Sequence, residues 1–344
     1  MVMQIGFIGV GGLGFLQCRT FAEMDDVHIV AAADVTQGAR DLFEEEFGAP
    51  AYEHYRTLLG EHGDELDAVA IVTPHTLHYE QASAALRQGV NVLVEKPMVT
   101  DVAHAVDLVE TAAERELVLQ VGYQRHFHPA FREIRRIIQS GRIGDVHTVN
   151  CYLGQDWIEP HRETWRGDTA LSGGGQLYDS GSHLLDALLW TTESRPATVM
   201  AEMEFDSPGL DVNSSLSIRL ESDGDPILAS VAISGDGVEM DIAEGYFYWG
   251  TGGRLSYVDG VIEVTETNAV TYTTELTQGT DFETLDRAKL ENFVESVRGD
   301  VEPAVPGEVG LQVTGVTEAA YTSAEEGRRV DVQALIDDAR AERD

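Results

Sequence analysis

The chain has 344 residues, enough for two domains, and 43% of them are hydrophobic. Its 60 acidic residues outnumber 23 basic ones, so the formal net charge is −37. We therefore expect neither nucleic acid nor an anionic membrane surface as a partner, because both bind basic faces.

Cysteine usage and hydropathy indicate a soluble cytoplasmic protein. Cys18 and Cys151 are too few for a disulfide framework, no signal-like segment opens the sequence, and no apolar run approaches the roughly 20 residues of a membrane helix. The acid excess, with only two lysines, predicts adaptation to a salt-filled cytoplasm. Molar salt shortens the Debye length to about 3 Å and so screens the repulsion between like charges.

The first elements in the chain predict a dinucleotide-binding turn. A strand over residues 3–10 runs into Gly9-Val10-Gly11-Gly12-Leu13-Gly14, and a helix over 15–24 and a strand over 27–33 follow. In this G-x-G-x-x-G the first Gly permits a tight turn, the second lets the pyrophosphate approach, and the third lets helix and strand pack closely. The pyrophosphate would then lie at the helix N-terminus.

The acid that ends the second strand predicts the choice of cofactor. Asp34 lies 20 residues after Gly14 and is placed to accept hydrogen bonds from the ribose hydroxyls. A 2′-phosphate would be repelled there, and residues 35–38 contain no Arg or Lys, so NAD is favoured over NADP. The alternative is that Asp34 only caps the next helix.

The same alternation continues to about residue 122. Strands are expected at 68–72, 90–94 and 117–121, and helices at 39–47, 77–88 and 101–114. Strands separated by helices of this length indicate βαβ units with right-handed crossovers. Residues 1–123 are therefore predicted to form a Rossmann domain, a doubly wound parallel sheet in an α/β fold.

The strand at 90–94 leads into Glu95-Lys96-Pro97, where proline stops the ladder. Lys96 thus lies at the carboxyl end of a parallel strand, where ligands bind in open α/β sheets. It is one of only two lysines in the chain. We expect its amine to donate to a substrate oxygen, and the alternative is an ordinary solvated lysine.

The pattern changes in residues 124–344, which are predicted to form a second, α+β domain. Several segments alternate with a period of two, which is typical of a mostly antiparallel open sheet with helices on one face. The expected strands are 145–153, 199–205, 215–220, 226–234 and 238–249, and the expected helices are 130–140, 282–298 and 307–326. The uncovered sheet face, near Tyr246, Phe247, Tyr248 and Trp249, predicts a homodimer or homotetramer interface.

A glycine-rich segment, residues 172–186, predicts a second group of functional side chains. Asp179 and His183 are spaced i and i+4 on the expected helix, so a hydrogen bond between them would fix the histidine tautomer. Gly181 would leave bare backbone for a ligand. The alternative is an ordinary amphipathic helix with a polar side.

Taken together, these motifs resemble those of the Gfo/Idh/MocA family of nicotinamide-dependent oxidoreductases over essentially the whole length. The matching positions are Gly9, Gly11, Gly14, Thr73-Pro74, Glu95-Lys96-Pro97, residues 122–129, residues 173–186 and residues 319–327. His75 stands where the family often has Asn, and His126 where a second Arg is common.

The resemblance implies NAD-dependent oxidation of a secondary alcohol on a sugar, inositol or related polyol. The family places the nicotinamide between the lysine and the helix histidine, which makes Lys96 and His183 the catalytic pair, with Asp179 orienting the substrate and His183. The implied cofactor-binding residues are Gly9, Gly11, Gly12, Leu13, Gly14, Asp34, Thr73, Pro74, His78, Glu95 and Lys96. The implied substrate-binding residues are Lys96, Tyr123, Arg125, Trp157, His161, Arg166, Asp179 and His183.

Three alternatives remain at this point. Two histidine pairs, His75/His78 and His126/His128, have a spacing that metal ligands use, but no Cys or carboxylate accompanies them, and we expect no metal. Some proteins resembling the family use NAD within a glycosidase cycle without net turnover. A non-catalytic dinucleotide or sugar sensor is the third possibility.

Overall fold

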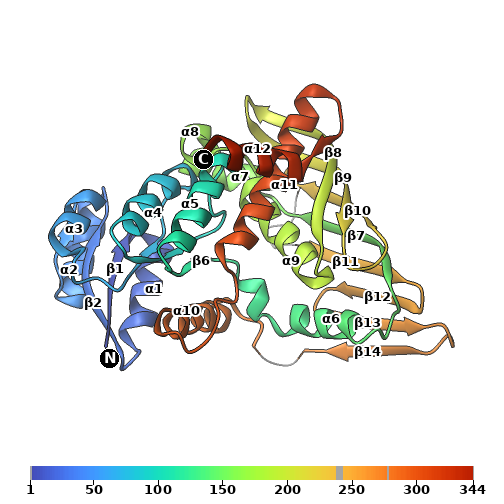
Figure 1. Ribbon diagram of the computed structural model, residues 1–344, viewed down its shortest axis with the longest axis horizontal. Coiled ribbons are helices and arrows are strands. Elements are labelled where there is room, and N and C mark those ends of the chain that lie inside the picture. Colours follow the sequence, from blue (N-terminus) through green and yellow to red (C-terminus); the bar gives the residue numbers. More distant parts are fainter. Residues whose placement is uncertain (1, 238–242, 277–278, 344) are drawn as a thin grey trace. The chain divides into compact units, whose positions relative to one another are not determined.

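The computed structural model describes residues 2–237, 243–276 and 279–343 (Figure 1). Its contacts divide the chain into two compact units. The first contains Met1–Val99, His104–Gln124 and Phe282–Leu311; the second contains Thr100–Ala103, Arg125–Asp281 and Gln312–Asp344. Two segments thus belong to the unit opposite to that of their sequence neighbours: Thr100–Ala103 is part of the second unit, and a late segment, Phe282–Leu311, returns to the first.

The first unit is built on a parallel sheet with the order β3-β2-β1-β4-β5-β6 among the described residues. Its strands are β1 Met3–Ile8, β2 Val27–Ala33, β3 Ala51–Tyr52, β4 Ala68–Ile71, β5 Asn91–Val94 and β6 Leu119–Val121. Its helices are α1 Gly12–Ala22, α2 Gln37–Phe47, α3 Tyr55–His62, α4 His78–Arg87, α5 Val102–Glu114 and α10 Phe282–Arg298. The predicted Rossmann sheet is confirmed.

The late segment returns because α10 is amphipathic and completes the core of this unit. Leu290 and Phe293 of α10 are fully buried in one cluster with Ile5 and Phe7 of β1. Burying each such side chain contributes about 1.5–3 kcal/mol. Two polar residues of α10, Asp286 and Lys289, lie on the same buried face.

The second unit is built on a mixed, mostly antiparallel sheet with the order β14-β13-β12-β11-β7-β10-β9-β8-β15 among the described residues. Only β7 and β10 pair in parallel within that part of the chain. The strands are β7 Val146–Gly154, β8 Arg195–Ser207, β9 Leu210–Glu221, β10 Ile227–Ser234, β11 Ala243–Gly250, β12 Gly253–Val258, β13 Val261–Glu266, β14 Thr271–Glu275 and β15 Val330–Asp331. The helices are α6 Pro129–Gln139, α7 Ile158–His161, α8 Thr169–Ser172, α9 Ser182–Thr192, α11 Gly307–Glu326 and α12 Val332–Arg343.

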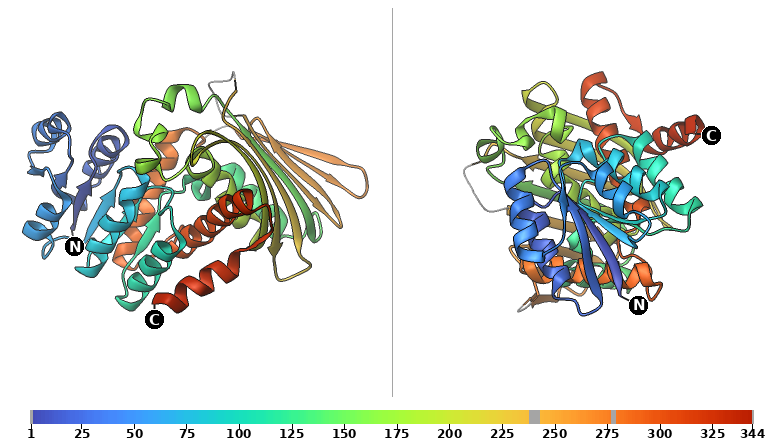
Figure 2. Two further views of the ribbon diagram at one scale, coloured as in Figure 1. Left: turned by 90° about the horizontal axis from the view of Figure 1, so that it is seen from above. Right: turned by 90° about the vertical axis from the view of Figure 1, so that its left-hand side faces the viewer.

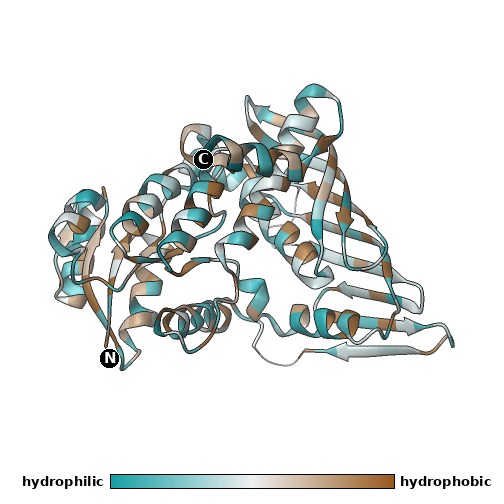
Figure 3. Cartoon of the chain, viewed as in Figure 1, coloured by the Kyte–Doolittle hydropathy of each residue, from teal (hydrophilic) through white to brown (hydrophobic). Residues whose placement is uncertain are grey.

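Helices cover one face of this sheet, and α6, α9 and α11 lie together on that side (Figure 2). Cys151, Tyr246 and Tyr248 are buried on it, and the Tyr248 hydroxyl lies 2.9 Å from Thr191 Oγ1 of α9. Strands β9 and β10 alternate between buried and exposed residues. Figure 3 shows this period as alternating brown and paler bands along the strands. The predicted α/β fold with a largely antiparallel second sheet is confirmed.

Several elements were not expected from the sequence: α3, β3, β12, β13, β14, β15 and α12. Their signals are weak, since β3 has two residues and every residue of β14 is exposed. Of the strand predicted at 238–249, residues 238–242 lie outside the described residues and the rest is β11. Among the described helices, none combines the length and apolar character needed to cross a bilayer.

Candidate active site

The turn after β1 needs glycine at its three motif positions for two different reasons. A Cβ on Gly9, whose φ is +90°, would lie 2.3 Å from the carbonyl oxygen of Val72, and one on Gly14 would lie 2.1 Å from that of Gly9. A Cβ on Gly11 would meet nothing nearer than Asp34 Oδ2 at 3.9 Å. The first and third glycines therefore serve packing, whereas the second faces open space where a ligand can approach the backbone.

Helix α1 begins directly at this turn, and its N-terminus is suited to an anion. Its N-cap, Gly11, offers no side-chain cap, and no acidic residue lies in the first turn. Gly12 is exposed and Leu13 half-buried. The N–H of Gly14 donates to the Gly11 carbonyl oxygen at 2.9 Å, whereas those of Gly12 and Leu13 precede the first intrahelical hydrogen bond, so they and the positive end of the helix fit a pyrophosphate. The residues present therefore fit a dinucleotide.

Asp34 lies beside the glycine turn and hydrogen-bonds to its backbone. Its Oδ2 accepts the N–H of Val10 at 2.9 Å and its Oδ1 accepts that of Thr36 at 2.8 Å. The N-cap residue of α2 is Thr36, so Asp34 is not the cap that the alternative supposed. An ionised carboxylate has about four acceptor positions, so two remain for ribose hydroxyls.

Sequence reasoning missed Arg40, which lies beside Asp34. The guanidinium of Arg40 donates from Nη1 to the backbone oxygen of Asp34 at 2.7 Å and from Nη2 to Gln37 Oε1. Arg40 lies beyond residues 35–38, but the first turn of α2 brings its side chain back to Asp34. A cation therefore lies next to the acid that was predicted to exclude NADP.

The turns after β4 and β5 are tied together by a buried histidine. His78 is fully buried, with Nε2 2.9 Å from the carbonyl oxygen of Thr73 and Nδ1 2.9 Å from that of Pro97. Burial lowers its pKa, and the two carbonyls and the charge of Glu95 offset this only in part. Both ring nitrogens face the chain itself, so His78 braces the Thr73-Pro74 turn, and its direct bond to a cofactor stays a prediction.

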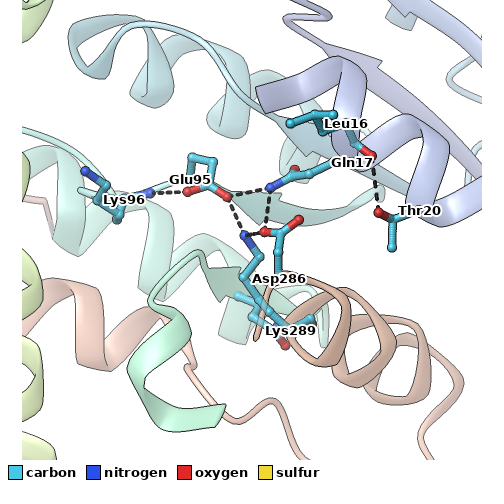
Figure 4. A network of polar contacts seen from close by, with 8 residues as sticks. Leu16, Gln17, Thr20, Glu95, Lys96, Asp286 and Lys289 are labelled. Carbon is cyan, nitrogen blue, oxygen red and sulfur yellow. Dashed lines mark hydrogen bonds and ion pairs between the residues drawn. The ribbon is translucent and has the colours of Figure 1, made fainter. Parts of the chain in front are cut away.

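Glu95 and Lys96, which follow β5, differ in exposure. Glu95 is buried and its carboxylate belongs to a polar network inside the first unit, whereas Lys96 is half-buried. The side chain of Lys96 extends away from that network (Figure 4). The strand end therefore directs the Glu95 charge into the polar network and the Lys96 charge away from it.

In the second unit, Asp179 gathers several predicted substrate residues. It is 5% exposed, and its Oδ2 accepts from Trp157 Nε1 at 2.9 Å and from Arg166 Nε at 3.0 Å. The ring of His161 contacts Trp157 edge-on, with 5.5 Å between centroids. Four residues expected to bind substrate are thus brought together around one buried carboxylate.

The helix that carries Asp179 and His183 is not a continuous α-helix. Leu177–Gly181 form a π-helical turn and α9 begins at Ser182, with His183 half-buried in its first turn. Such π turns occur frequently at functional sites. The expectation that Gly181 leaves bare backbone for a ligand is wrong, because a Cβ there would lie 2.8 Å from the side chain of Ile233.

The glycine segment before this turn is organised by two residues that the motif analysis missed. Asp211 accepts the N–H groups of Gly175 at 2.8 Å and Leu177 at 2.9 Å, and the hydroxyl of Tyr321. A Cβ on Gly175 would lie 1.9 Å from the backbone oxygen of Asp211, so only glycine fits. Burial raises the pKa of Asp211, and these hydrogen bonds offset part of the effect.

The remaining predicted residues lie in buried surroundings. Arg125 donates to the Tyr246 hydroxyl at 2.6 Å and pairs with Glu244, and Tyr123 is 0% exposed. Burial opposes the charge of Arg125, but Glu244 and its neighbours raise its pKa overall. The guanidinium therefore supports the fold of its own unit, and substrate binding by Arg125 and Tyr123 stays a prediction.

The histidines of the two pairs contact other residues of the fold. His126 Nε2 lies 2.9 Å from the buried Asp186, and His128 Nδ1 accepts the N–H of Ala130 as the N-cap of α6. His75 is buried, with its ring 6.1 Å from that of His78. Over the described ranges, no three His, Cys, Asp or Glu side chains gather as metal ligands do.

Comparison with known families gives matches in both units. The profile described as "Oxidoreductase family, NAD-binding Rossmann fold" (GFO_IDH_MocA) matches residues 3–123. The profile described as "GFO/IDH/MocA C-terminal domain" matches residues 131–240.

Individual proteins also resemble this chain, at sequence identities of 24% to 30% in three examples. Rhizopine catabolism protein MocA of Rhizobium meliloti is 30% identical over 194 residues, which is 56% of this chain and 58% of that protein, so the match spans less than two thirds of that relative. D-xylose 1-dehydrogenase (NADP(+)) 2 of Haloferax volcanii is 26% identical over an alignment 353 residues long, gaps included, which covers 96% of this chain and 100% of that protein. The crystal structure of an aldose-aldose oxidoreductase from Caulobacter crescentus, complexed with glycerol, has a TM-score of 0.81 at 24% identity, covering 96% of this chain and 100% of that one.

Proposed function

The chain belongs to the Gfo/Idh/MocA family of oxidoreductases, and from that membership we propose that it oxidises a secondary alcohol of a sugar, inositol or related polyol with NAD. The observation that carries the proposal is the glycine turn. Gly11 is open where Gly9 and Gly14 are closed, at an uncapped helix N-terminus that fits a pyrophosphate.

Lys96 and His183 are the proposed catalytic residues. The nicotinamide, when bound, accepts the hydride from the carbinol carbon. His183 takes the hydroxyl proton, and Lys96 donates to the developing carbonyl oxygen and so stabilises charge that grows in the transition state. This pairing rests on the family resemblance, since the two side chains belong to different units.

Asp179 is proposed to orient the substrate and His183. Its carboxylate is held by Trp157 and Arg166, which restrict it to one position. Arg166, half-buried beside it, supplies hydrogen-bond donors of the kind that orient a polar ligand, whereas Trp157 is fully buried and holds the carboxylate in place. The named activities of the relatives, D-xylose dehydrogenation and aldose oxidoreduction, support the same substrate class.

For the cofactor we propose NAD, on the ground that the Asp34 carboxylate would repel a 2′-phosphate. Arg40, at 2.7 Å from the Asp34 backbone oxygen, would offset part of that repulsion. The Haloferax relative is named as NADP-dependent, which makes the balance of these two side chains the decisive quantity.

The acid excess and the similarity to a Haloferax protein support a second proposal, that the chain works in a salt-filled cytoplasm. Activity assays therefore need molar salt, at which repulsion between exposed charges is screened.

The uncovered sheet face supports self-association with a second copy of the chain. A row across five strands is uncharged and half-buried or exposed, in a chain with a net charge of −37. The strand register places in this row Phe247, Asn150, Ser230, Ser217 and Met200. The variant Ser217→Glu/Ser230→Glu should dissociate the oligomer, as measured by light scattering, and Thr57→Glu in α3 is the control. A wild-type monomer would refute it.

The function is tested by following reduced nicotinamide spectrophotometrically with pentoses, hexoses, inositols and sugar acids in molar salt. Steady formation of NADH with at least one free polyol is expected. Hydrolysis of glycosides without net NADH would replace the proposal with the glycosidase cycle. Tight NADH binding without turnover on any substrate would replace it with the sensor.

A further inference from the structure

Lys289 is the second lysine of the chain, and it is buried. It lies in α10 with 1% exposure, among the largest fully buried side chains. The only other lysine is Lys96, and every remaining basic residue is arginine. A buried ammonium is costly unless it is paired and hydrogen-bonded, so its surroundings must hold it.

Two carboxylates and one amide surround Lys289 (Figure 4). Its Nζ lies 2.5 Å from Glu95 Oε1 and 2.6 Å from Asp286 Oδ1. Gln17 Nε2 of α1 donates to the same two oxygens, at 2.8 and 3.2 Å. Glu95 is 8% exposed, Asp286 4% and Gln17 0%. Three segments of the chain thus meet at one buried polar cluster.

The cluster consists of charged groups. Burial alone would raise the pKa of Glu95, but the Lys289 ammonium, the Gln17 amide and Lys96 bring it below its usual value. Burial would likewise lower the pKa of Lys289, and the two carboxylates raise it instead. With both acids ionised and the amine protonated, the cluster carries one net negative charge.

The orientation of Gln17 agrees with that charge state. Its amide nitrogen faces both carboxylates, and its Oε1 is buried without a hydrogen-bond partner among the described residues. An unsatisfied buried oxygen is costly, but a hydrogen bond to a charged group is roughly twice as strong as one between neutral groups. Two such bonds outweigh the loss, which holds only while both acceptors are carboxylates.

The cluster is connected to Lys96 through the second oxygen of Glu95. Oε2 accepts the backbone N–H of Lys96 at 3.3 Å (Figure 4). A Cβ on Gly122, which follows β6, would lie 2.6 Å from this oxygen, so the carboxylate fills the available space. Gln120 of β6 donates to the backbone oxygen of Lys289 at 3.1 Å and fixes α10 from the other side.

We propose, on the basis of the proposed function of Lys96, that Lys289 is a positioning residue for the catalytic lysine. Its ammonium holds the Glu95 carboxylate, the Glu95 carboxylate holds the main chain of Lys96, and the cluster presents one negative charge beside the Lys96 ammonium. The chain therefore uses its two lysines for one task, the second setting the position and the field of the first.

Two substitutions change the cluster charge in opposite directions. Lys289→Met removes the ammonium and moves the net charge from −1 toward −2, whereas Glu95→Gln leaves the pair of Lys289 and Asp286 with a net charge of zero. We expect kcat to fall about tenfold to hundredfold in each, the range that a small misplacement of a catalytic group costs. The affinity for the cofactor, measured by titration, should stay unchanged in Lys289→Met, whose residue is not among the expected cofactor-binding residues.

The pH dependence separates positioning from a merely structural role. One limb of the pH–kcat profile should report Lys96, and this limb is identified by its disappearance in Lys96→Ala. It should move to higher pH in Lys289→Met and to lower pH in Glu95→Gln. The double variant Asp286→Asn/Lys289→Met restores a net charge of −1 and should return the limb to its wild-type position. His78 of α4 is the other titratable group that senses the Glu95 charge.

Arg287→Met is the matched control, on the same helix but with an exposed side chain that pairs with Glu23. It should leave kcat and the pH profile unchanged. A folded Lys289→Met with wild-type kcat and pH profile would overturn the inference, as would shifts of the same sign in Lys289→Met and Glu95→Gln. If Lys289→Met does not fold, Glu95→Gln and the double variant decide, and an unshifted limb in Glu95→Gln refutes the proposal.

Failure of the proposed function gives a different result. If Lys96→Ala keeps wild-type turnover, the catalytic assignment is wrong. If Lys96→Ala loses turnover while the cluster variants behave as wild type, only the role of Lys289 is refuted.

Discussion

At the scale of single residues, His128 couples the fold to pH. Its Nδ1 accepts the Ala130 N–H at 3.1 Å and so caps α6, a role that needs the neutral ring. Burial and the charge of Arg125 lower its pKa from 6.5 to about 4. The unfolded chain therefore binds a proton at pH values where the folded one does not, and this contribution to stability is lost as the pH falls from about 6.5 to 4.

We expect the free energy of unfolding of the wild type to decrease by about 1–3 kcal/mol over that range through His128. His128→Asn keeps a capping acceptor without titrating. Denaturant unfolding at several pH values in molar salt should therefore show a flatter pH dependence for the variant. Parallel curves for the two proteins would show that His128 does not contribute.

We propose that Asp34 and Arg40 set the selectivity between NAD and NADP. Like charges at the 2′-phosphate would cost on the order of 1–3 kcal/mol, and the exposed part of this repulsion weakens as salt rises. Asp34→Ser should narrow the NAD/NADP ratio of kcat/KM, mostly by a gain with NADP. Arg40→Ala should widen it by a loss with NADP. A wild-type preference for NADP would show that Arg40 outweighs Asp34.

At the scale of elements, the second glycine of the turn should matter for dinucleotide binding and the third for the stability of the fold. Gly11 has φ −83°, which any residue adopts, and its Cβ would enter open space. Gly11→Ala should therefore leave the unfolding midpoint unchanged and weaken dinucleotide binding, because the methyl group occupies the place of the pyrophosphate.

Gly14→Ala is the matched control, since its Cβ would lie 2.1 Å from the Gly9 carbonyl oxygen. It should destabilise the unit by about 1–3 kcal/mol, the usual cost of overpacking. Calorimetric titration with NAD and thermal unfolding measure the two effects. Equal losses of binding and stability in both variants would contradict the distinction.

Elements whose signals are local could be predicted from the sequence, and those that depend on distant contacts could not. The glycine turn, β5 with Lys96 and the α10 range follow from residues adjacent in the chain. The return of α10 to the first core does not, because an amphipathic pattern does not say which surface it covers. Asp211 and Lys289 were missed for the same reason, since each acts on a motif more than 30 residues away.

Some site predictions were affected by local geometry that spacing alone does not give. The i, i+4 relation of Asp179 and His183 assumed one α-helix, whereas Asp179 lies in a π turn and His183 in the α-helix that follows. Gly181 was expected to face a ligand and packs on Ile233 instead. The nearness of Arg40 to Asp34 follows from the first turn of α2, and helical spacing could have revealed it.

At the scale of the whole molecule, a net charge of −37 must be balanced by the solvent. Without salt the Debye length is long and repulsion among the carboxylates destabilises the folded chain. Circular dichroism during dialysis from molar to millimolar salt should show unfolding. Full secondary structure in dilute buffer would contradict adaptation to high salt.

Lys96 is proposed to take part in alcohol oxidation, and the variant Lys96→Ala removes its amine. Turnover of the best polyol from the substrate screen should fall by about 10²–10⁴ because a positioned acid–base group is lost. NAD should still bind, as measured by titration, because the glycine turn is intact, and any loss of affinity reports the expected contact of Lys96 with the cofactor. Unchanged turnover in a folded Lys96→Ala would contradict the account.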